Sequence, residues 1–332
     1  MANILLRSPY YEYRSQPQSS GNTAKSATLE LSVGGTVITT MNKDTNLSGT
    51  TGSVAFEIAD LCRDYLDITF NNTYSSQTIA ITGTLTFKSK TLDEIASGET
   101  AVTVGTPVSI SHTGLDGYFE FMEGLGTGVD NSAVTLSTST DAVLQDNTTI
   151  YAPDNTAGQI PYFDASASAI VYQSFAASDT SETVLSTTYN IERVCTKHEA
   201  YKVTFVNKYG ALQDFYFTGK TTENINIERT NFKGSILDSN SRYSTNNHSK
   251  KIYNTLANET LILNTPPMSF DTVNEAFKQL LVSEQVWIYK DSKTTPINIT
   301  SNTQRFKTGV NDQLIQYTIT AEYAFDMISN IR

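Results

Sequence analysis

The chain has 332 residues, with 23 Lys and Arg against 34 Asp and Glu, which gives a formal net charge of −11. Such an acidic protein lacks the basic face with which a general nucleic-acid binder displaces counterions from phosphates. Charged residues make up only 17% of the chain, and its aromatic residues are mainly Tyr (18) and Phe (15). Abundant Thr, Ser, Asn and Tyr favour extended β-structure and exclude collagen, coiled coil and disorder, and the length fits two domains.

Residues 1–25 predict an N-terminal arm rather than a folded unit. Tyr10, Tyr11 and Tyr13 stand in a polar segment that has little else apolar after Leu6. Tyrosine brings a large contact area at low conformational cost, so we expect these three side chains to form an assembly interface. The arm would gain order from the partner surface on which it lies.

Residues 26–145 predict a first β-rich domain with one helix. Residues 27–33 alternate apolar and polar side chains, and Gly34-Gly35 marks a hairpin turn into the next strand. Residues 54–65 carry apolar side chains at helical spacing and predict one amphipathic helix. Further strands are predicted over residues 78–87 and near 102–104, 108–110, 118–122 and 134–136.

Residues 146–182 predict a linker region. Pro153, Gly158, Pro161 and many Ala and Ser residues interrupt the hydrophobic pattern there. Only one or two short strands are expected in it, such as the one over residues 169–172.

Residues 183–332 predict a second β-rich domain with one helix. Its clearest feature is a hairpin whose strands lie near 201–206 and 214–220, followed by a strand over 225–229 and a loop or exposed arm over 236–251. The helix is expected to start at Ser269 or Asp271 and to bury Val273, Ala276, Phe277, Leu280 and Leu281 on one face. The next strand, residues 286–289, is expected to bury Trp287. The predicted fold class is therefore mainly β, a β-rich α+β protein with two antiparallel β-sandwich or barrel-like domains, each with one amphipathic helix.

Charge is unevenly distributed along the chain. Residues 91–192 contain no Lys or Arg but fourteen Asp and Glu, whereas residues 193–251 contain ten basic and five acidic residues. Glu120, Glu123 and Asp130 represent the acidic surface that we expect from the first stretch. This surface could line a channel and repel DNA, could serve solubility, or could dock the basic segment of a neighbouring copy.

The sequence offers little catalytic chemistry, and we predict that the protein is not an enzyme. Three histidines and the absence of a local nucleophile or phosphate-binding signature leave no candidate catalytic residues and no candidate cofactor. Cys195 and His198 have the spacing of half a zinc site, but no second pair follows, so no metal is expected. The two cysteines, Cys62 and Cys195, are expected to be free, buried thiols. The N-terminus does not resemble a secretory signal, and no apolar run is long enough to span a membrane.

Three segments carry a resemblance to a known group of proteins: residues 54–67, residues 201–217 and the ending over residues 317–327. They resemble virion structural proteins of tailed bacteriophages, particularly phages of Bacteroidota including the crAss-like group. The resemblance implies a tail or tail-adjacent ring component that assembles in the host cytoplasm and lacks catalytic residues.

The leading hypothesis is thus a structural protein that forms a homo-oligomeric ring in a phage tail, tail hub or baseplate around the DNA channel. Its expected partners are further copies and other tail or portal-proximal virion proteins, and it would meet passing DNA without specific contacts. The alternative is a receptor- or glycan-binding tail protein or a capsid decoration protein, which would need exposed aromatic side chains in a groove.

Overall fold

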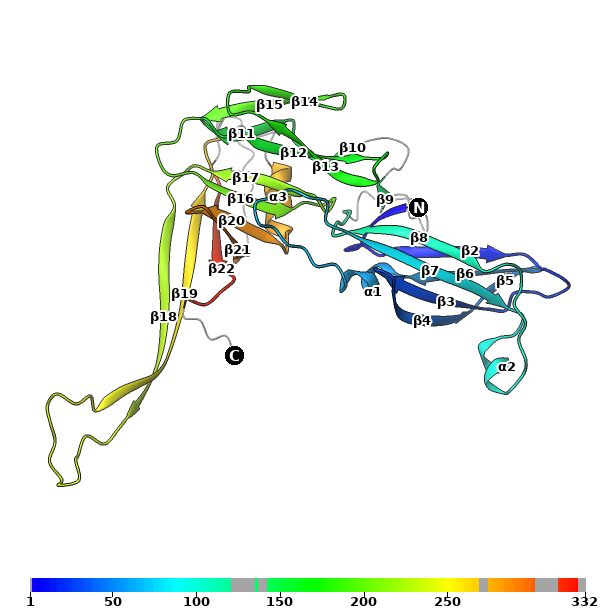
Figure 1. Ribbon diagram of the computed structural model, residues 1–332, viewed down its shortest axis with the longest axis horizontal. Helices are drawn as coiled ribbons and strands as arrows, with labels where there is room; N and C mark the ends of the chain where they lie inside the picture. Colours follow the sequence, from blue (N-terminus) through cyan, green and yellow to red (C-terminus); the bar gives the residue numbers. More distant parts are fainter. Residues whose placement is uncertain (1, 121–134, 137–141, 269–273, 302–315, 328–332) are drawn as a thin grey trace.

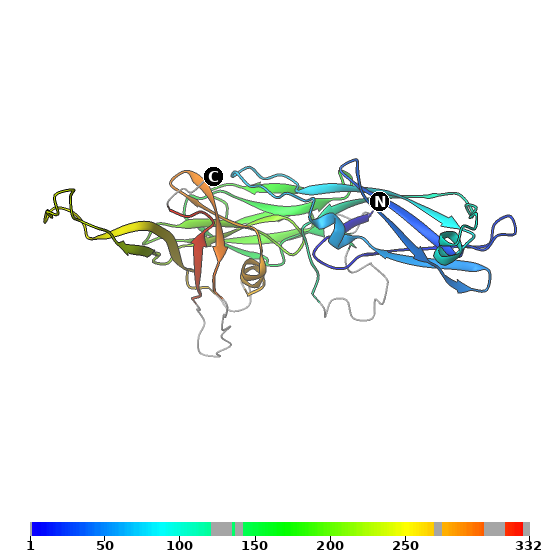
Figure 2. The same cartoon turned by 90° about the horizontal axis from the view of Figure 1, so that it is seen from below.

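A computed structural model of the protein describes residues 2–120, 135–136, 142–268, 274–301 and 316–327. It is mainly β, with 53% strand and 6% helix, and its sheets are largely antiparallel, so the predicted β-rich fold class is confirmed. The molecule is elongated, and a long β-hairpin projects from one end (Figure 1; Figure 2).

The N-terminal half is built around a six-stranded sheet with the order β4-β3-β7-β8-β1-β9. The strands are β1 (Ala2–Leu5), β3 (Ser26–Val33), β4 (Thr36–Asp44), β7 (Thr78–Lys88), β8 (Val108–Leu115) and β9 (Thr135–Leu136). Leu29 and Leu31 of β3 are buried because alternate residues of a strand share one face. Gly34 and Gly35 have φ of 58° and 84°, values that glycine adopts without a side-chain clash, and they form the predicted turn between β3 and β4.

A three-stranded sheet in the order β2-β6-β5 shares its core with the larger sheet. Its strands are β2 (Tyr11–Gln16), β5 (Asn46–Ser48) and β6 (Thr51–Glu57). Val54 and Phe56 of β6 join Leu29 and Leu31 in one buried cluster. Each sheet therefore has one apolar face, and the two faces cover each other.

The segment expected to be an N-terminal arm is instead part of this core. β1 pairs in parallel with β8 and antiparallel with β9, and Ile4, Leu6 and Tyr10 are buried. β2 continues the same pattern by pairing with β6 along its whole length. A short apolar run can form a strand when strands on both sides complete its backbone hydrogen bonds. The sequence of the run itself does not show that such partner strands exist.

The helix expected over residues 54–65 is shorter and starts later, because residues 54–57 belong to a strand. β6 extends to Glu57, and only α1 (Ala59–Arg63) is helical. Val54, Phe56 and Ile58 are spaced two apart, so they satisfy strand alternation as well as part of a helical pattern. The carboxylate of Glu57 accepts hydrogen bonds from the backbone N–H of Ala59 and Asp60, which fixes the change from strand to helix. A further short helix, α2 (Leu92–Ala96), begins at a capping box formed by Thr91 and Glu94.

The stretch expected to be a linker, residues 146–182, is folded. It supplies strands to two three-stranded sheets, β10-β12-β13 and β11-β15-β14. The strands are β10 (Ala142–Val143), β11 (Thr149–Pro153), β12 (Gly158–Asp164), β13 (Ala169–Phe175), β14 (Ser181–Val184) and β15 (Thr187–Val194). Ile160, Phe175 and Tyr189 are buried with Tyr216 of the following domain. The short strands gain their stability from this packing, which explains why their periodicity is weak.

The C-terminal half contains a seven-stranded sheet in the order β17-β16-β20-β21-β22-β19-β18. The strands are β16 (Tyr201–Val206), β17 (Leu212–Phe217), β18 (Thr222–Lys233), β19 (Lys250–Asn264), β20 (Val286–Lys290), β21 (Lys293–Ile299) and β22 (Thr318–Tyr323). β16 and β17 form the predicted hairpin, and Trp287 is buried as expected. Helix α3 (Asn274–Val282) buries Ala276, Phe277 and Leu280 on this sheet. The predicted helix start at Ser269 or Asp271 and the residue Val273 lie outside the described residues.

The halves of the molecule are joined by a buried cluster of Leu5 and Leu115 with Ala211 and by two further sets of contacts. The first is made by residues 66–77, which we call the strap. Phe70 of the strap packs 5.7 Å from Trp287 between ring centroids, and the Tyr74 hydroxyl donates a hydrogen bond of 2.5 Å to Asp214. In the second set, Glu284 pairs with Arg7 and Arg63 of the first half. These contacts link the N-terminal and C-terminal halves directly.

Asp214 is the acidic centre of the strap contact, and it yields a prediction about pH. The Thr204 hydroxyl also donates to its carboxylate, at 2.6 Å, and the Lys202 ammonium lies 3.0 Å from the Tyr74 hydroxyl. Loss of hydration raises the pKa of Asp214, although the charge of Lys202 and the two hydroxyl donors oppose the rise.

The pKa of Asp214 is higher in the folded protein than in the unfolded chain, where it is about 3.9. Between these two pKa values, the free energy of unfolding of the natural protein falls as pH rises. Asp214→Asn removes the titration. The free energy of unfolding of the variant, relative to the natural protein, is thus expected to rise between about pH 4 and the folded pKa. Urea titrations at several pH values measure this, and Asp67→Asn, at an exposed position on the strap, controls for the lost charge. If the difference in free energy of unfolding between Asp214→Asn and the natural protein does not change with pH, the prediction is contradicted.

Candidate functional site

The residues expected to form an assembly interface are separated by the fold. Tyr10 points into the core beside His112, and burial raises the pKa of its hydroxyl to about 12. Tyr11 and Tyr13 share the opposite, outer face of β2 and are 39% and 50% exposed. Only these two tyrosines remain available to a partner.

The acidic surface residues are only partly within the described structure. Glu120 is exposed, whereas Glu123 and Asp130 lie outside the described residues. Of this set, the described structure therefore places Glu120 alone.

The thiols and the remaining titratable groups form no chemical site in the described ranges. Cys62 is buried, which raises its pKa to about 12, but Cys195 is exposed, so the expectation of two buried thiols is wrong for Cys195. Among the described residues, no three His, Cys, Asp or Glu side chains are grouped to hold a metal ion. None of the helices in these ranges combines the length and apolar character required to cross a bilayer.

The most distinctive surface is the hairpin of β18 and β19, which projects away from the body of the molecule (Figure 1; Figure 2). β19 pairs with β22 only over Thr260–Asn264, and its remaining residues pair with β18 alone. Every residue of β18 is exposed. We call residues 222–264 the ribbon. An isolated two-stranded ribbon is marginally stable in water, so a surface of this kind is typical of a segment that pairs with something else.

Large apolar side chains are concentrated on the ribbon. Among the described residues, nineteen large hydrophobic side chains are exposed, and eight of these lie between positions 225 and 256. They are Ile225, Ile227, Phe232, Leu237, Tyr243, Ile252, Tyr253 and Leu256. Tyr243 and Tyr253 are 68% and 70% exposed. Clusters of exposed apolar side chains in a soluble protein mark an interaction surface.

The ribbon also presents a free edge and two different faces. β18 is the last strand of its sheet, so its outer backbone groups have no strand partner among the described residues. Ile225 and Ile227 lie on one face with Ala257, and Glu228 and Leu256 lie on the other. A register shift between Thr230 and Asn231 marks a bulge that twists the distal part of the ribbon.

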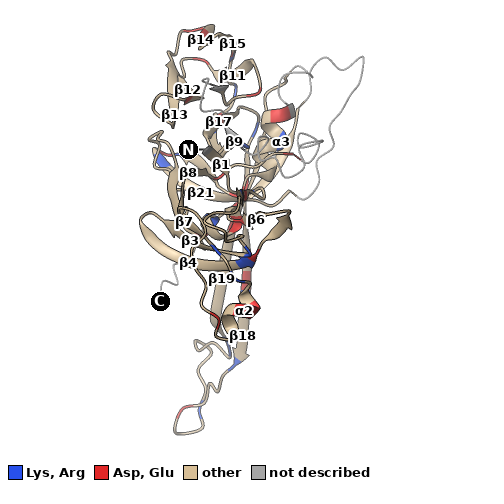
Figure 3. Ribbon diagram, turned by 90° about the vertical axis from the view of Figure 1, so that its right-hand side faces the viewer, with Lys and Arg blue, Asp and Glu red and all other residues tan. Residues whose placement is uncertain are grey.

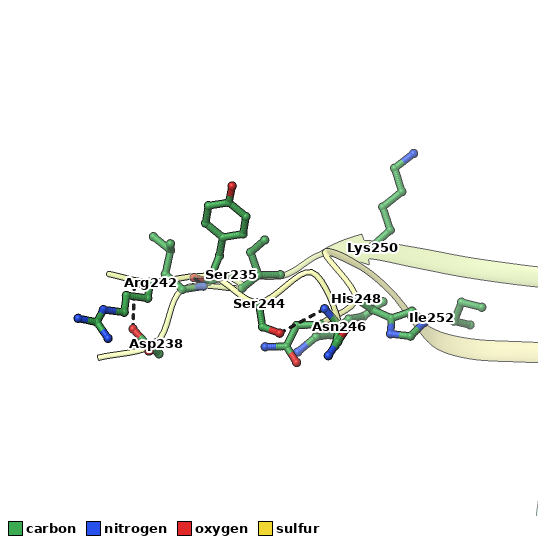
Figure 4. Close-up of a pocket in the computed structure, with 13 residues that line it drawn as sticks. Ser235, Asp238, Arg242, Ser244, Asn246, His248, Lys250 and Ile252 are labelled. Carbon is green, nitrogen blue, oxygen red and sulfur yellow. Dashed lines mark hydrogen bonds between the residues drawn. The ribbon is translucent and has the colours of Figure 1, made fainter. Parts of the chain in front are cut away.

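The tip of the ribbon is an ordered loop over residues 234–249. The Asp238 carboxylate accepts hydrogen bonds from the backbone N–H of Asn240 and Arg242, and the Ser244 hydroxyl oxygen accepts one from the N–H of Asn246 (Figure 4). The loop encloses a hollow of about 860 Å³ with a mixed polar and cationic lining that includes His248. Figure 4 shows Lys250 pointing away from the ribbon, into solvent.

The sequence revealed part of this site. Residues 225–229 were expected to be a strand and residues 236–251 a loop or exposed arm, and both lie in the ribbon. The projection itself was missed. The signal that could have revealed it is the apolar residues Ile225, Ile227 and Phe232 interleaved with polar and charged ones on a strand that has no apolar face to bury.

In comparisons with known proteins, no family model, no curated protein sequence and no solved structure matches the chain.

Proposed function

We propose that the protein is a structural, non-catalytic assembly protein of a tailed bacteriophage, a ring-forming component of the tail, tail hub or baseplate. The observation that carries this proposal is the ribbon, with eight exposed large apolar side chains on two strands that extend beyond the rest of the fold. The resemblance of residues 54–67, 201–217 and 317–327 to phage virion proteins supplies the biological setting.

The energetics of the ribbon favour a partner in the assembled state. Its eight exposed apolar side chains add little to the core of a monomer, and each would gain about 25 cal/mol per Å² of apolar surface removed from water. Its strands would also gain order from a partner, as segments that assemble across subunits do. Assembly therefore accounts for a feature that the stability of one chain does not require.

Removal of the distal ribbon tests the proposal. Residues 228–256 are replaced by Asn-Gly, a dipeptide that closes a two-residue hairpin between the paired Ile227 and Ala257. We expect the shortened protein to keep its thermal unfolding transition but to lose self-association in native mass spectrometry and incorporation into particles. The matched control is Val37→Ser, which changes an apolar side chain that is 54% exposed on β4. Normal assembly of the shortened protein would contradict the proposal.

The second candidate function is a receptor- or glycan-binding tail protein or a capsid decoration protein. The observation that favours it is the hollow at the ribbon tip, where the exposed Tyr243 stands beside amide and hydroxyl side chains. In that case Tyr243→Ser would abolish adsorption of particles to host cells while leaving their assembly intact. The proposed assembly function predicts that Tyr243→Ser particles still adsorb.

A further inference from the structure

The distal ribbon carries positive charge that nothing in the described structure neutralises. Five basic residues lie between positions 228 and 256, against two acidic residues, Glu228 and Asp238, and the Asp238 carboxylate is occupied by backbone N–H groups. The basic residues are Arg229, Lys233, Arg242, Lys250 and Lys251. None of them forms a salt bridge within the described part of the chain.

The arrangement of these cations is unfavourable for a chain on its own. Lys233 lies directly opposite Lys250 in the register of the two strands, and Lys251 lies opposite Phe232. Like charges facing each other across a strand pair are destabilising. The pairing therefore does not stabilise the ribbon, and an anionic surface bound there would relieve the repulsion.

The opposite charge lies on strands β11 to β15, residues 149–194, which we call the acidic module. This module has five carboxylates and one cation, Arg193. The carboxylates belong to Asp154, Asp164, Asp179, Glu182 and Glu192. None forms a salt bridge among the described residues, although those of Asp164 and Asp179 accept backbone N–H groups, as that of Asp238 does. Arg193 donates to the carbonyl oxygens of Pro153, Thr156, Ala176 and Asp179.

The acidic module and the ribbon tip lie far apart in the molecule, so they cannot neutralise each other within one chain. β14 and β15 of the module are at the top of Figure 1 and Figure 3, above the sheet from which the ribbon extends, and the ribbon tip is at the bottom of both views. Complementary surfaces at distant places on one chain favour a head-to-tail contact between copies. Such a contact repeats, and it closes into a ring when the rotation between copies permits.

We propose that the distal ribbon of one copy docks on the acidic module of a second copy. This inference rests on the proposed assembly function and identifies the partner surface for it. The apolar side chains of the ribbon provide buried area, while the opposite charges select the partner and its orientation. Because the charges lie at the surface, we also expect self-association to weaken as salt concentration rises.

Variants of the full-length protein in which the charges of the ribbon and of the acidic module are reversed test the inference. The variant Lys250→Glu with Lys251→Glu, and separately the variant Asp154→Lys with Glu192→Lys, should each weaken self-association about tenfold or more in sedimentation velocity. The chain that carries all four substitutions restores opposite charges at the contact and should recover most of the lost association. The control, Lys293→Glu, reverses an exposed cation on β21, away from both surfaces.

The outcomes separate this inference from the proposed function. If the shortened ribbon abolishes assembly but the four-substitution chain does not recover, the ribbon docks elsewhere, and the inference fails while the assembly function stands. If the natural protein stays monomeric and its ribbon instead binds a short DNA duplex in a manner lost with Lys250→Glu and Lys251→Glu, the partner is nucleic acid and the inference is overturned. If the shortened protein assembles normally, the proposed function itself fails.

Discussion

Replacing Phe277 by alanine is expected to lower the free energy of unfolding by about 3–5 kcal/mol. The Phe277 side chain has no exposed surface and joins α3 to the seven-stranded sheet. Its ring stacks on Tyr317 with centroids 4.9 Å apart and contacts Phe215 at 5.7 Å. The substitution therefore removes a large apolar group from the centre of a packed cluster and leaves a cavity that its aromatic neighbours cannot fill completely.

Urea denaturation followed by circular dichroism measures the loss. Val282→Ala is the matched control on the same helix, because Val282 is 53% exposed and should change the free energy of unfolding by less than about 0.5 kcal/mol. A loss below about 1 kcal/mol for Phe277→Ala would show that this face of α3 does not hold the helix on the sheet.

The features that the sequence predicts well are those in which local pattern and tertiary burial agree. The hairpin of β16 and β17 has apolar residues on a strand that is buried almost throughout, separated by a turn with Gly210 at φ 80°. Helix α3 has one apolar face, and that face is the one that packs. In both cases the residues needed to define the element lie within it.

The features that the sequence does not predict depend on partners elsewhere in the chain. β1 is a strand because β8 and β9 flank it, and β11 is a strand because β15 pairs with it in parallel. Such pairings join residues that are far apart in the sequence, so the local residue pattern of each strand does not reveal them. Tyr10 shows the same limit, since its neighbours Tyr11 and Tyr13 are exposed and nothing in the local sequence distinguishes it from them.

At the candidate site, which is the ribbon, local pattern and tertiary burial disagree. The strand β18 of the ribbon alternates apolar and polar residues in part, but every one of its residues is exposed. Its charge excess was visible in the sequence as the basic block over residues 193–251, and the opposing acidic block was visible as well. Their wide separation in the molecule needed the fold, and it is this separation that makes a contact between copies the favoured interpretation (Figure 3).

Phe70 should have an effect comparable to that of Phe277, because it attaches the strap to the C-terminal half. Its side chain is 7% exposed and belongs to a cluster with Val206, Leu212 and Trp287. The Lys202 ammonium lies 5.8 Å from the centre of its ring, which adds a cation–π attraction. Phe70→Ala is expected to reduce the free energy of unfolding by about 3–5 kcal/mol.

Trp287 provides a direct readout of this contact, because it is the single tryptophan of the chain and packs on Phe70. In the folded Phe70→Ala variant, water should reach the indole, and the tryptophan emission should shift to longer wavelength before any unfolding occurs. Tyr65→Ala is the control, since Tyr65 precedes the strap and is 52% exposed. If Phe70→Ala destabilises the protein without changing the native emission, the loss comes from elsewhere and the strap does not cover Trp287. If the emission shifts as expected, the strap covers Trp287 and adds to the contacts that hold the two halves together.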